Sequence, residues 1–338
     1  MDRRLSQLPL DDFAKERLLS LLSRSAQEWD RCAVSPDADA IHDFRVSLRR
    51  FSEALRLFKD LFPKPPRNQV RSELRQVMRL AGRTRDIDIA REAFVLSDAT
   101  VSPGTDLFLN NERAIAEAAF RAALSVGVIT QVTKRWDQTL GLSDVKRVMT
   151  NTEESGESGR KPHEPVTLRA RLIAPQLLAS YCRSGEKVAH EGVKPARLHE
   201  LRLSGKHLRY ALEILRPIYG RTMDDLLASL RETQSYLGEI SDATATLAWL
   251  KRQNLQQTPE VLHLRHYLER RAGKGAGRFI TYWEDHWGLP VFRERWISYL
   301  GRYAGRMPPP RVIRPPNEIV LVPSEALPES ETKAAISA

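Results

Sequence analysis

Two stretches of this chain decide its fold. Residues 41–58 read IHDFRVSLRRFSEALRLF, and residues 198–215 read LHELRLSGKHLRYALEIL. In each stretch the apolar residues recur three and four positions apart, which is the spacing of an amphipathic α-helix. Aligned at an offset of 157 residues, the two stretches share basic positions: His42 with His199, Arg45 with Arg202, and Arg49 with Lys206. The alignment predicts that one helix occurs twice.

A second signature follows each of these helices after about forty residues. GRTRD at 82–86 matches GEISD at 238–242 at an offset of 156, with the glycine and the aspartate in register. Two signatures at nearly one offset indicate an internal duplication. We expect repeat one over about residues 10–150 and repeat two over about residues 166–304.

The remaining ordered stretches also have helical spacing, so the sequence predicts an all-α fold. Between the repeats, residues 151–165 are poor in apolar groups and rich in Gly, Ser and Glu, as linkers are. From residue 307 the chain is rich in proline and poor in core-forming residues. We expect residues 1–306 to form one helical domain and residues 307–338 to form a disordered tail.

The repeated helix carries an apolar stripe and a separate basic stripe. On a wheel of about 100° per residue, the two stripes lie side by side, and the second copy repeats the phase of the first. Basic positions that border a core stripe face a groove between helices, so the sequence predicts a basic channel. The apolar stripe consists of Ile41, Phe44, Leu48, Phe51, Leu55 and Phe58 in the first copy and of Leu198, Leu201, Leu208, Leu212 and Leu215 in the second.

The positive charge of the chain is concentrated around the repeated helix. The 338 residues contain 53 Lys and Arg against 43 Asp and Glu, a formal net charge of +10. Residues 41–85 carry a net charge of +8 and residues 197–221 a net charge of +4, so the remainder is nearly neutral. Arginine supplies 41 of the 53 bases, and guanidinium groups bind phosphate through two hydrogen bonds at once. The pattern predicts a polyanionic partner.

The strings HDFRVSLRR, GRTRDID, LHELRLSGKHLRYALE and LRETQSYLGEISDA resemble the CHAD family, the conserved histidine α-helical domain. The resemblance covers about residues 10–304. It implies two pseudo-symmetric four-helix units around a central basic channel that binds inorganic polyphosphate, often with association to polyphosphate granules. Some members are fused to a triphosphate-tunnel (CYTH) domain, but no such domain fits in this chain, so the activity of the fused enzyme is not implied.

The resemblance and the basic stripes together imply a set of side chains that contact polyphosphate. The second copy has Ile240 and Ser241 before Asp242, where the first has basic residues before Asp86, which predicts weaker binding at that end. We expect the two aspartates to cap or orient basic side chains. The expected contacts are His42, Arg45, Arg49, Arg50, Arg56, Lys59, Arg79, Arg83, Arg85, His199, Arg202, Lys206, Arg209 and Tyr210.

Two other functions stay open at this point. Some metal-dependent phosphohydrolases, which act on polyphosphate or nucleotides, use an adjacent His-Asp pair as metal ligands. His42 and Asp43 form such a pair, but they lie about 100° apart on the helical wheel. Nucleic-acid binding would use the same basic stripes, although Tyr210 is the one aromatic residue that joins them. We expect a non-enzymatic polyphosphate-binding protein with no cofactor and no metal.

The sequence also bears on the compartment. The first twelve residues are charged where a secretory signal is apolar, and no window approaches 18 uninterrupted apolar residues. Cys32 and Cys182 fall in helical patterns as small, half-buried thiols rather than in a metal-ligand spacing. We therefore expect a cytosolic protein, associated with polyphosphate granules, that makes no contact with membranes.

Overall fold

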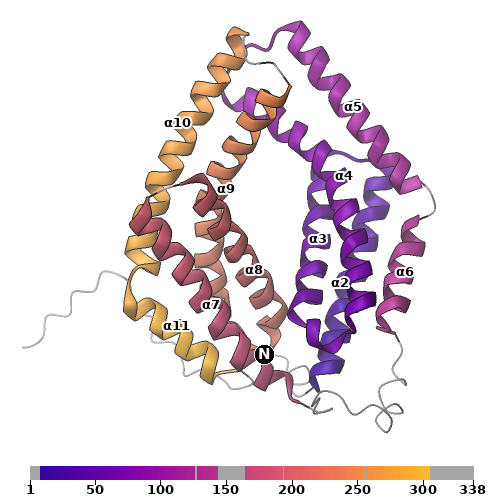
Figure 1. Cartoon of the computed structure of the whole chain (residues 1–338), viewed down its shortest axis with the longest axis vertical. Coiled ribbons are helices and arrows are strands. Elements are labelled where there is room, and N and C mark those ends of the chain that lie inside the picture. Colours follow the sequence, from indigo (N-terminus) through magenta and orange to yellow (C-terminus); the bar gives the residue numbers. More distant parts are fainter. Residues whose placement is uncertain are drawn as a thin grey trace, which may run out of the picture. The chain divides into compact units, whose positions relative to one another are not determined.

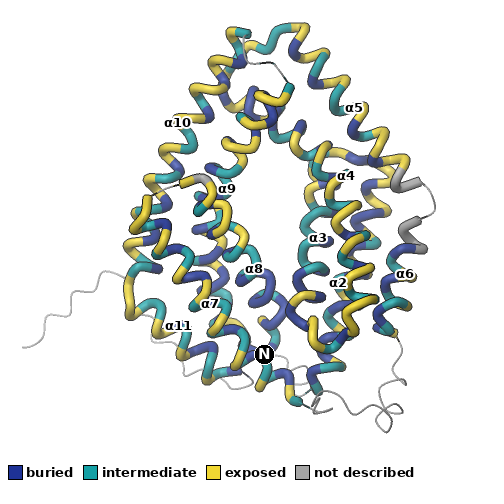
Figure 2. Tube along the Cα trace, in the orientation of Figure 1, coloured by how far each residue is buried: buried dark blue, intermediate teal, exposed yellow. Residues whose placement is uncertain are grey.

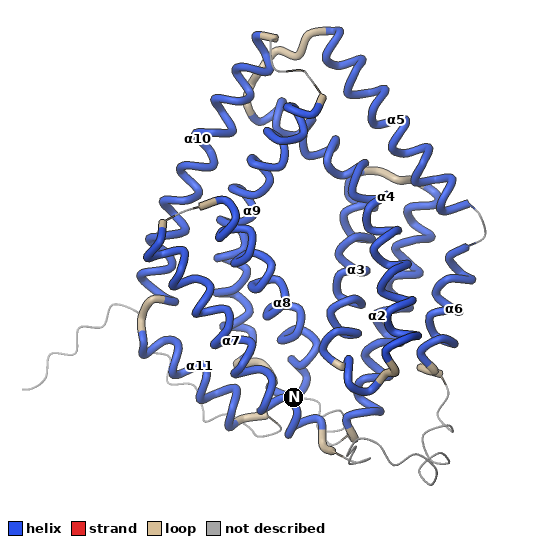
Figure 3. Tube along the Cα trace, viewed as in Figure 1, coloured by secondary structure: helices blue, strands red, loops and turns tan. Residues whose placement is uncertain are grey.

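The computed structural model describes residues 8–125, 128–143, 164–192, 194–253, 255 and 258–304. Within these ranges every regular element is a helix, which confirms the predicted all-α fold (Figure 3). No helix among them is long and apolar enough to cross a lipid bilayer. The predicted tail and most of the predicted linker lie outside the described residues.

The described part of the first half forms five α-helices and a short 3₁₀ turn, η1 (Lys59–Leu61). α2 and α3 are antiparallel neighbours, and α4 is the longest helix at 33 residues. In chain order the α-helices are α2 (Leu10–Val34), α3 (Ala38–Leu57), α4 (Lys64–Leu96), α5 (Pro103–Ser125) and α6 (Val128–Leu140) (Figure 1).

The described part of the second half also forms five α-helices, in a similar order of lengths. They have 26, 25, 30, 24 and 13 residues, against 25, 20, 33, 23 and 13 in the first half. The internal duplication stays a prediction, with which these lengths agree. The helices are α7 (Val166–Glu191), α8 (Pro195–Tyr219), α9 (Met223–Arg252), α10 (Pro259–Tyr282) and α11 (Pro290–Arg302).

Each half was expected to contain four helices, and the described residues give five because the last helix of each set is divided. In the second half the division is a π-helical turn, η2 (Trp283–Trp287), followed by Pro290 at the start of α11. Proline has no backbone N–H and clashes with the preceding turn, so a continuous helix cannot pass through this position without distortion. In the first half, α5 and α6 are separate on either side of residues 126–127.

The helices that carry the two signatures have ends with identifiable causes. The Asp37 carboxylate accepts a hydrogen bond at 2.7 Å from the backbone N–H of Ala40 and so caps the start of α3. At its other end, α8 stops at Gly220, whose φ of 75° lies in the left-handed region that favours glycine.

The two halves meet at two places along their length. At one, α3 packs against α8 within the larger hydrophobic core, which includes Phe44, Phe51 and Leu208 (Figure 2). At the other, α4 packs against α9 and α10 around a smaller core that includes Phe94 and Trp249. The helices that carry the two signatures, α3 and α4 in the first half and α8 and α9 in the second, are thus the ones that meet at these junctions (Figure 1).

Candidate functional site

The apolar stripes of the repeated helix are buried, as the helical wheel predicts. Ile41, Phe44 and Phe51 on α3 have no exposed surface, and neither do Leu201 and Leu212 on α8. The remaining members of both stripes are at most 6% exposed. Since the basic stripe lies beside the apolar one on each helix, this burial places the basic side chains at the edge of the α3–α8 contact.

Two ion pairs join α3 to α8 across the halves. The Arg50 guanidinium lies 3.3 Å from a Glu213 carboxylate oxygen, and His207 pairs with Glu53. Burial raises the pKa of Glu53 to about 7, against the opposing charges of Arg56 and Arg71 on the same side. The predicted contact residue Arg50 therefore already has a partner in the opposite half.

Five basic side chains from both halves form what we call the basic cluster: Arg45, Arg49, Arg85, Arg202 and Lys206. Arg49 on α3 is close enough to α8 for its charge to lower the pKa of both Arg202 and Lys206. Like charges shift each other's pKa in this direction only where solvent screening is incomplete. The fold thus brings the basic stripes of the two signatures together.

Arg45 is held firmly against α4. Its Nη1 donates a hydrogen bond of 2.9 Å to the carbonyl oxygen of Met78. A Cβ atom on Gly82 would lie 2.9 Å from this same nitrogen, so the first glycine of GRTRD leaves room for the guanidinium. Burial and the charge of Arg49 lower the pKa of Arg45 to about 10, while Asp86 opposes the shift.

A cavity of about 600 Å³ opens beside Arg45. Its lining comes from α3 and α4 alone and includes Arg79, Arg83 and Asp86 with the backbone around Gly82. Burial raises the pKa of Asp86, and the charge of Arg45 is the strongest opposing influence. The cavity belongs to the first half, so the channel between the halves that the sequence predicts stays a prediction.

The matching residues of the second half are arranged differently. Arg202 Nη2 lies 3.5 Å from a carboxylate oxygen of Asp242, and a Cβ on Gly238 would meet nothing within 4 Å. Burial lowers the pKa of Arg202; Asp242 opposes this shift and Arg49 adds to it. The buried Nε of Arg202 makes no hydrogen bond among the described residues. This pairing agrees with the expectation that Asp242 orients a basic side chain, which stays a prediction.

Lys206 has the most perturbed side chain of the cluster. Burial, followed by the charges of Arg202 and Arg49, lowers its pKa to about 7. Asp242 opposes the shift, and Arg209 adds to it. A lysine in this setting is only partly protonated at neutral pH, and a bound anion would draw a proton onto it.

The two histidines of the signatures lie at the exposed starts of α3 and α8. Partial burial and the charge of Arg85 lower the pKa of His42, and Arg49 and Arg45 add to the shift. His42 is therefore largely neutral at pH 7 while the site is empty. His199 is exposed.

The side chains of Arg209 and Tyr210 are less available to a ligand than the sequence predicts. Tyr210 is 4% exposed, and the Arg209 guanidinium lies over its ring at 4.6 Å from the centroid. Arg209 Nη1 also donates a hydrogen bond of 2.8 Å to Glu213. The buried Tyr210 ring supports Arg209 from below, so any part it takes in binding is indirect.

The other predicted contacts lie on the exposed edge of the site. Arg56 and Lys59 are exposed beyond the α3–α8 contact, and Arg79 and Arg83 are exposed at the cavity on α4. Arg85 is partly buried and lies 4.0 Å from Glu92.

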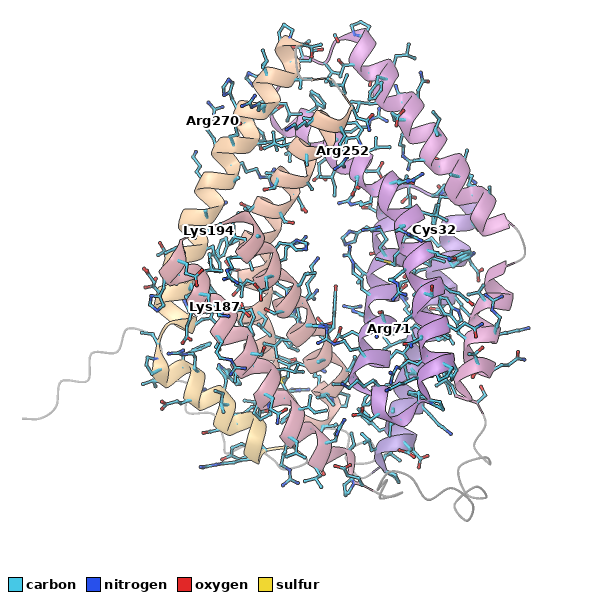
Figure 4. The ribbon with its side chains drawn as sticks, viewed as in Figure 1. Cys32, Arg71, Lys187, Lys194, Arg252 and Arg270 are labelled. Atoms are coloured by element: carbon cyan, nitrogen blue, oxygen red, sulfur yellow. The ribbon has the colours of Figure 1, made fainter. Side chains whose placement is uncertain are left out.

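Two basic residues near the site were not among the predicted contacts. The charge of Arg252, at the end of α9, opposes the rise in the pKa of Asp86 that burial causes, and the charge of Arg71 on α4 acts on Glu53 and Arg56 (Figure 4). Arg71 belongs to a run of arginines at four-residue spacing, which was a signal of a continuous basic face. Arg252 has no counterpart signal, because only the packing of α4 against α9 brings it near Asp86.

The described side chains contain no group of three or more His, Cys, Asp or Glu residues that could hold a metal ion. His42 and Asp43 are adjacent in sequence, but Asp43 accepts a hydrogen bond of 2.7 Å from Arg31 of α2. Cys32 and Cys182 are free thiols and are both buried, which is more than the half-buried setting that the sequence predicts.

The family model of the CHAD domain matches residues 17–251, which include both signatures. The chain belongs to the CHAD domain family. This family is associated with polyphosphate binding. Among curated proteins no match was found.

Solved structures show the same CHAD fold. The crystal structure of the CHAD domain from the plant Ricinus communis superposes with a TM-score of 0.57 at 18% identity, covering 88% of this chain and 93% of that one. PptA from Streptomyces chartreusis gives a TM-score of 0.58 at 16% identity, covering 82% and 99%. At these identities the likeness shows the fold alone.

Proposed function

We propose that this protein binds inorganic polyphosphate through the basic cluster and does not turn it over. The observation that carries the proposal is that burial lowers the pKa of Arg202 and Lys206 on α8 and that the charge of Arg49 on α3 lowers both further. Such a cluster is unfavourable when empty, and a polyanion relieves the repulsion by entering it. The family's association with polyphosphate supports the choice of ligand.

A phosphate polymer fits this cluster better than a single phosphate does. Arg45 and the cavity lie on the first half, whereas Arg202 and Lys206 lie on the second, so a flexible chain of phosphates contacts both. Linked contacts raise the overall affinity because the second contact becomes intramolecular. Affinity should therefore rise with chain length and fall steeply with salt, as counterion release requires.

The test is a titration with polyphosphate of several lengths at fixed salt, with phosphate release assayed in the same samples. We expect tight binding of long chains and no release. In the double variant Arg45→Glu/Arg202→Glu, binding should be abolished while the helical circular dichroism is kept. Undiminished binding by the double variant would refute the cluster as the site.

A matched control carries the same change of charge elsewhere. Lys187→Glu/Arg270→Glu alters two exposed residues on α7 and α10, neither of which takes part in the cluster (Figure 4). We expect this variant to lose only the small, salt-sensitive share of affinity that depends on net charge. Equal losses in the two double variants would mean that overall charge, rather than a site, binds the polymer.

The same titration separates the competing functions. Release of phosphate that depends on an added divalent metal would mean that the protein hydrolyses polyphosphate and does not only bind it. DNA or RNA that outcompetes polyphosphate at equal phosphate concentration would indicate a nucleic-acid-binding protein. Imaging in cells tests whether binding directs the protein to polyphosphate granules. We expect the unaltered protein on the granules and the Arg45→Glu/Arg202→Glu variant to be absent from them.

A further inference from the structure

The cavity of the first half is lined by charged side chains that have no partner among the described residues. Three of them, Arg79, Arg83 and Asp86 on α4, make no side-chain hydrogen bond or ion pair with any residue that the structure describes. On the same helix, Arg85 and Arg91 each have a guanidinium nitrogen within 4.0 Å of a carboxylate oxygen. The lining of the cavity therefore keeps both donors and an acceptor free for a ligand.

The charges of this lining suit a phosphate group that carries more than one negative charge. With Arg45 from α3, three arginines face one aspartate, a net formal charge of +2. Arg45 is held by its hydrogen bond of 2.9 Å to the carbonyl oxygen of Met78, so its other N–H groups are positioned before a ligand arrives. An internal phosphate of a polyphosphate chain carries one negative charge, whereas the terminal phosphate carries one or two.

The Asp86 carboxylate distinguishes between these two kinds of phosphate. An ionised carboxylate accepts hydrogen bonds and repels anions, so it is unfavourable beside an internal phosphate, which has no hydroxyl group. A terminal phosphate has a second ionisation with a pKa of about 6, and in its singly charged form it carries a hydroxyl group. This hydroxyl can donate a strong, charge-assisted hydrogen bond to a carboxylate. A free carboxylate among arginines therefore favours the end of a chain over its middle.

The apolar part of the lining gives a polyphosphate chain little to bind beyond the arginines. The side chains of Met78 and Leu80, which also line the cavity, offer no hydrogen-bond donor to phosphate. A run of internal phosphates inside the cavity would therefore bring some of its charge against apolar surface, which costs free energy. A chain that enters by its end avoids this cost and leaves its other units for the rest of the basic cluster.

We propose that this cavity binds the end of a polyphosphate chain: Asp86 accepts a hydrogen bond from the hydroxyl group of the terminal phosphate, and Arg45, Arg79 and Arg83 bind its other oxygens. The inference rests on the function proposed above and adds that the protein distinguishes the end of the polymer from its middle. Because a linear chain has two ends whatever its length, the number of tightly bound proteins reports the number of chains. Long chains still bind more tightly, since the units behind the end contact the second half.

The first experiment compares linear tripolyphosphate, which has two ends, with cyclic trimetaphosphate, which has none. Calorimetric titrations are done at about pH 6, where about half of the terminal phosphates carry a hydroxyl group. We expect the linear ligand to bind at least about tenfold more tightly. In Asp86→Asn the carboxylate no longer repels an internal phosphate, so this ratio should fall severalfold. Asp285→Asn, with the same change of charge at an exposed position in η2, should keep the ratio.

The second experiment uses long chains whose terminal phosphates are either free or capped as morpholidates, which have neither a hydroxyl nor an N–H group. Capping should weaken binding severalfold, although the internal units are unchanged. With free ends, tight binding should saturate near two proteins per chain for chains of two different lengths, as measured by sedimentation.

Four results would overturn the inference. They are equal affinity for free and capped chains, a number of tightly bound proteins that rises in proportion to chain length, and a linear-to-cyclic ratio that Asp86→Asn leaves unchanged. The fourth is binding of glycerol phosphate as tight as that of tripolyphosphate, since the cavity would then accept any phosphate monoester.

Failure of this inference is distinguishable from failure of the proposed function. A protein that binds long chains, but binds free and capped ends equally well, overturns this inference alone. A protein that prefers the linear ligand through Asp86, but gains no affinity from longer chains and is unaffected by Arg202→Glu, overturns the proposed polymer site across both halves alone.

Discussion

The two copies of the signature use the same residues in different ways. In the first half, Arg45 donates to a backbone carbonyl, lies against Gly82 and borders a cavity of about 600 Å³. In the second half, Arg202 pairs with Asp242, and the space around Gly238 is open. The comparison shows that related sequences specify the helix and its faces, whereas the partner of each arginine depends on the neighbouring helix.

This difference suggests a division of labour between the halves. Arg45 has a fixed direction because a backbone group holds it, so its free donors are available to a ligand without reorganisation. Arg202 has the Asp242 carboxylate beside it, which repels an incoming phosphate unless the phosphate displaces it. We therefore expect the first half to contribute more of the affinity for polyphosphate than the second.

The largest predicted effect comes from reversing each arginine alone. Arg45→Glu should weaken polyphosphate binding by about 100-fold, since it removes a charge-assisted contact and adds a repelling carboxylate. Arg202→Glu should weaken it by only about tenfold, because Asp242 already offsets part of that charge. Calorimetric titration at one salt concentration measures both, and equal losses would remove the asymmetry between the halves.

The next effect compares the two glycines. Gly82→Ala places a Cβ at 2.9 Å from the Arg45 guanidinium, which must move, and we expect binding to weaken about fivefold. Gly238→Ala meets nothing within 4 Å, so affinity should not change. This second variant should also gain about 0.5–1 kcal/mol in stability from helix propensity, measurable by thermal denaturation. If Gly238→Ala weakened binding and Gly82→Ala did not, the role of Gly82 in leaving room for the Arg45 guanidinium would be refuted.

Binding should also depend on pH through Lys206 in the second half. The pKa of Lys206 in the empty site is about 7, and a polyanion raises it. Below that value the amine is already charged and affinity is at its full level. Above it, binding must take up a proton, so affinity should fall about fivefold between pH 6.5 and 8.

The control for this pH effect is Lys206→Arg, which stays charged throughout the range. Its affinity should be nearly constant between pH 7 and 8. Protonation of His42, whose pKa is lowered, contributes at lower pH and is retained in the variant. A pH dependence above 7 that survives the substitution would assign the proton to another group.

The smallest effect tests the carboxylate that distinguishes the second half. Asp242→Asn removes the charge that competes with phosphate for Arg202, so binding should tighten about two- to threefold. Asp285→Asn, at an exposed position in η2, is the matched control and should change affinity less. Weaker binding by Asp242→Asn would mean that Asp242 helps binding by orienting Arg202 more than it hinders binding by competing with phosphate for this arginine.

Much of this architecture follows from the sequence because the underlying interactions are local. The three- and four-residue spacing determines which side of α3 and α8 enters the core, and burial of Ile41, Phe51 and Leu212 agrees with it. The basic stripe could be predicted in the same way. Division of the last helix of each half was not predicted, because a π-helical turn that ends at Trp287, shortly before Pro290, leaves only a weak sequence signal.

The sequence by itself determined the all-α fold, the two signatures and the concentration of positive charge beside the core. Only the tertiary structure decided which charges compensate one another, because an ion pair depends on helices far apart in sequence. Arg50 with Glu213, His207 with Glu53, and Arg252 near Asp86 are of this kind. Packing likewise buries Tyr210 beneath Arg209 and lowers the pKa of Lys206, since desolvation and neighbouring charge exist only in the folded chain.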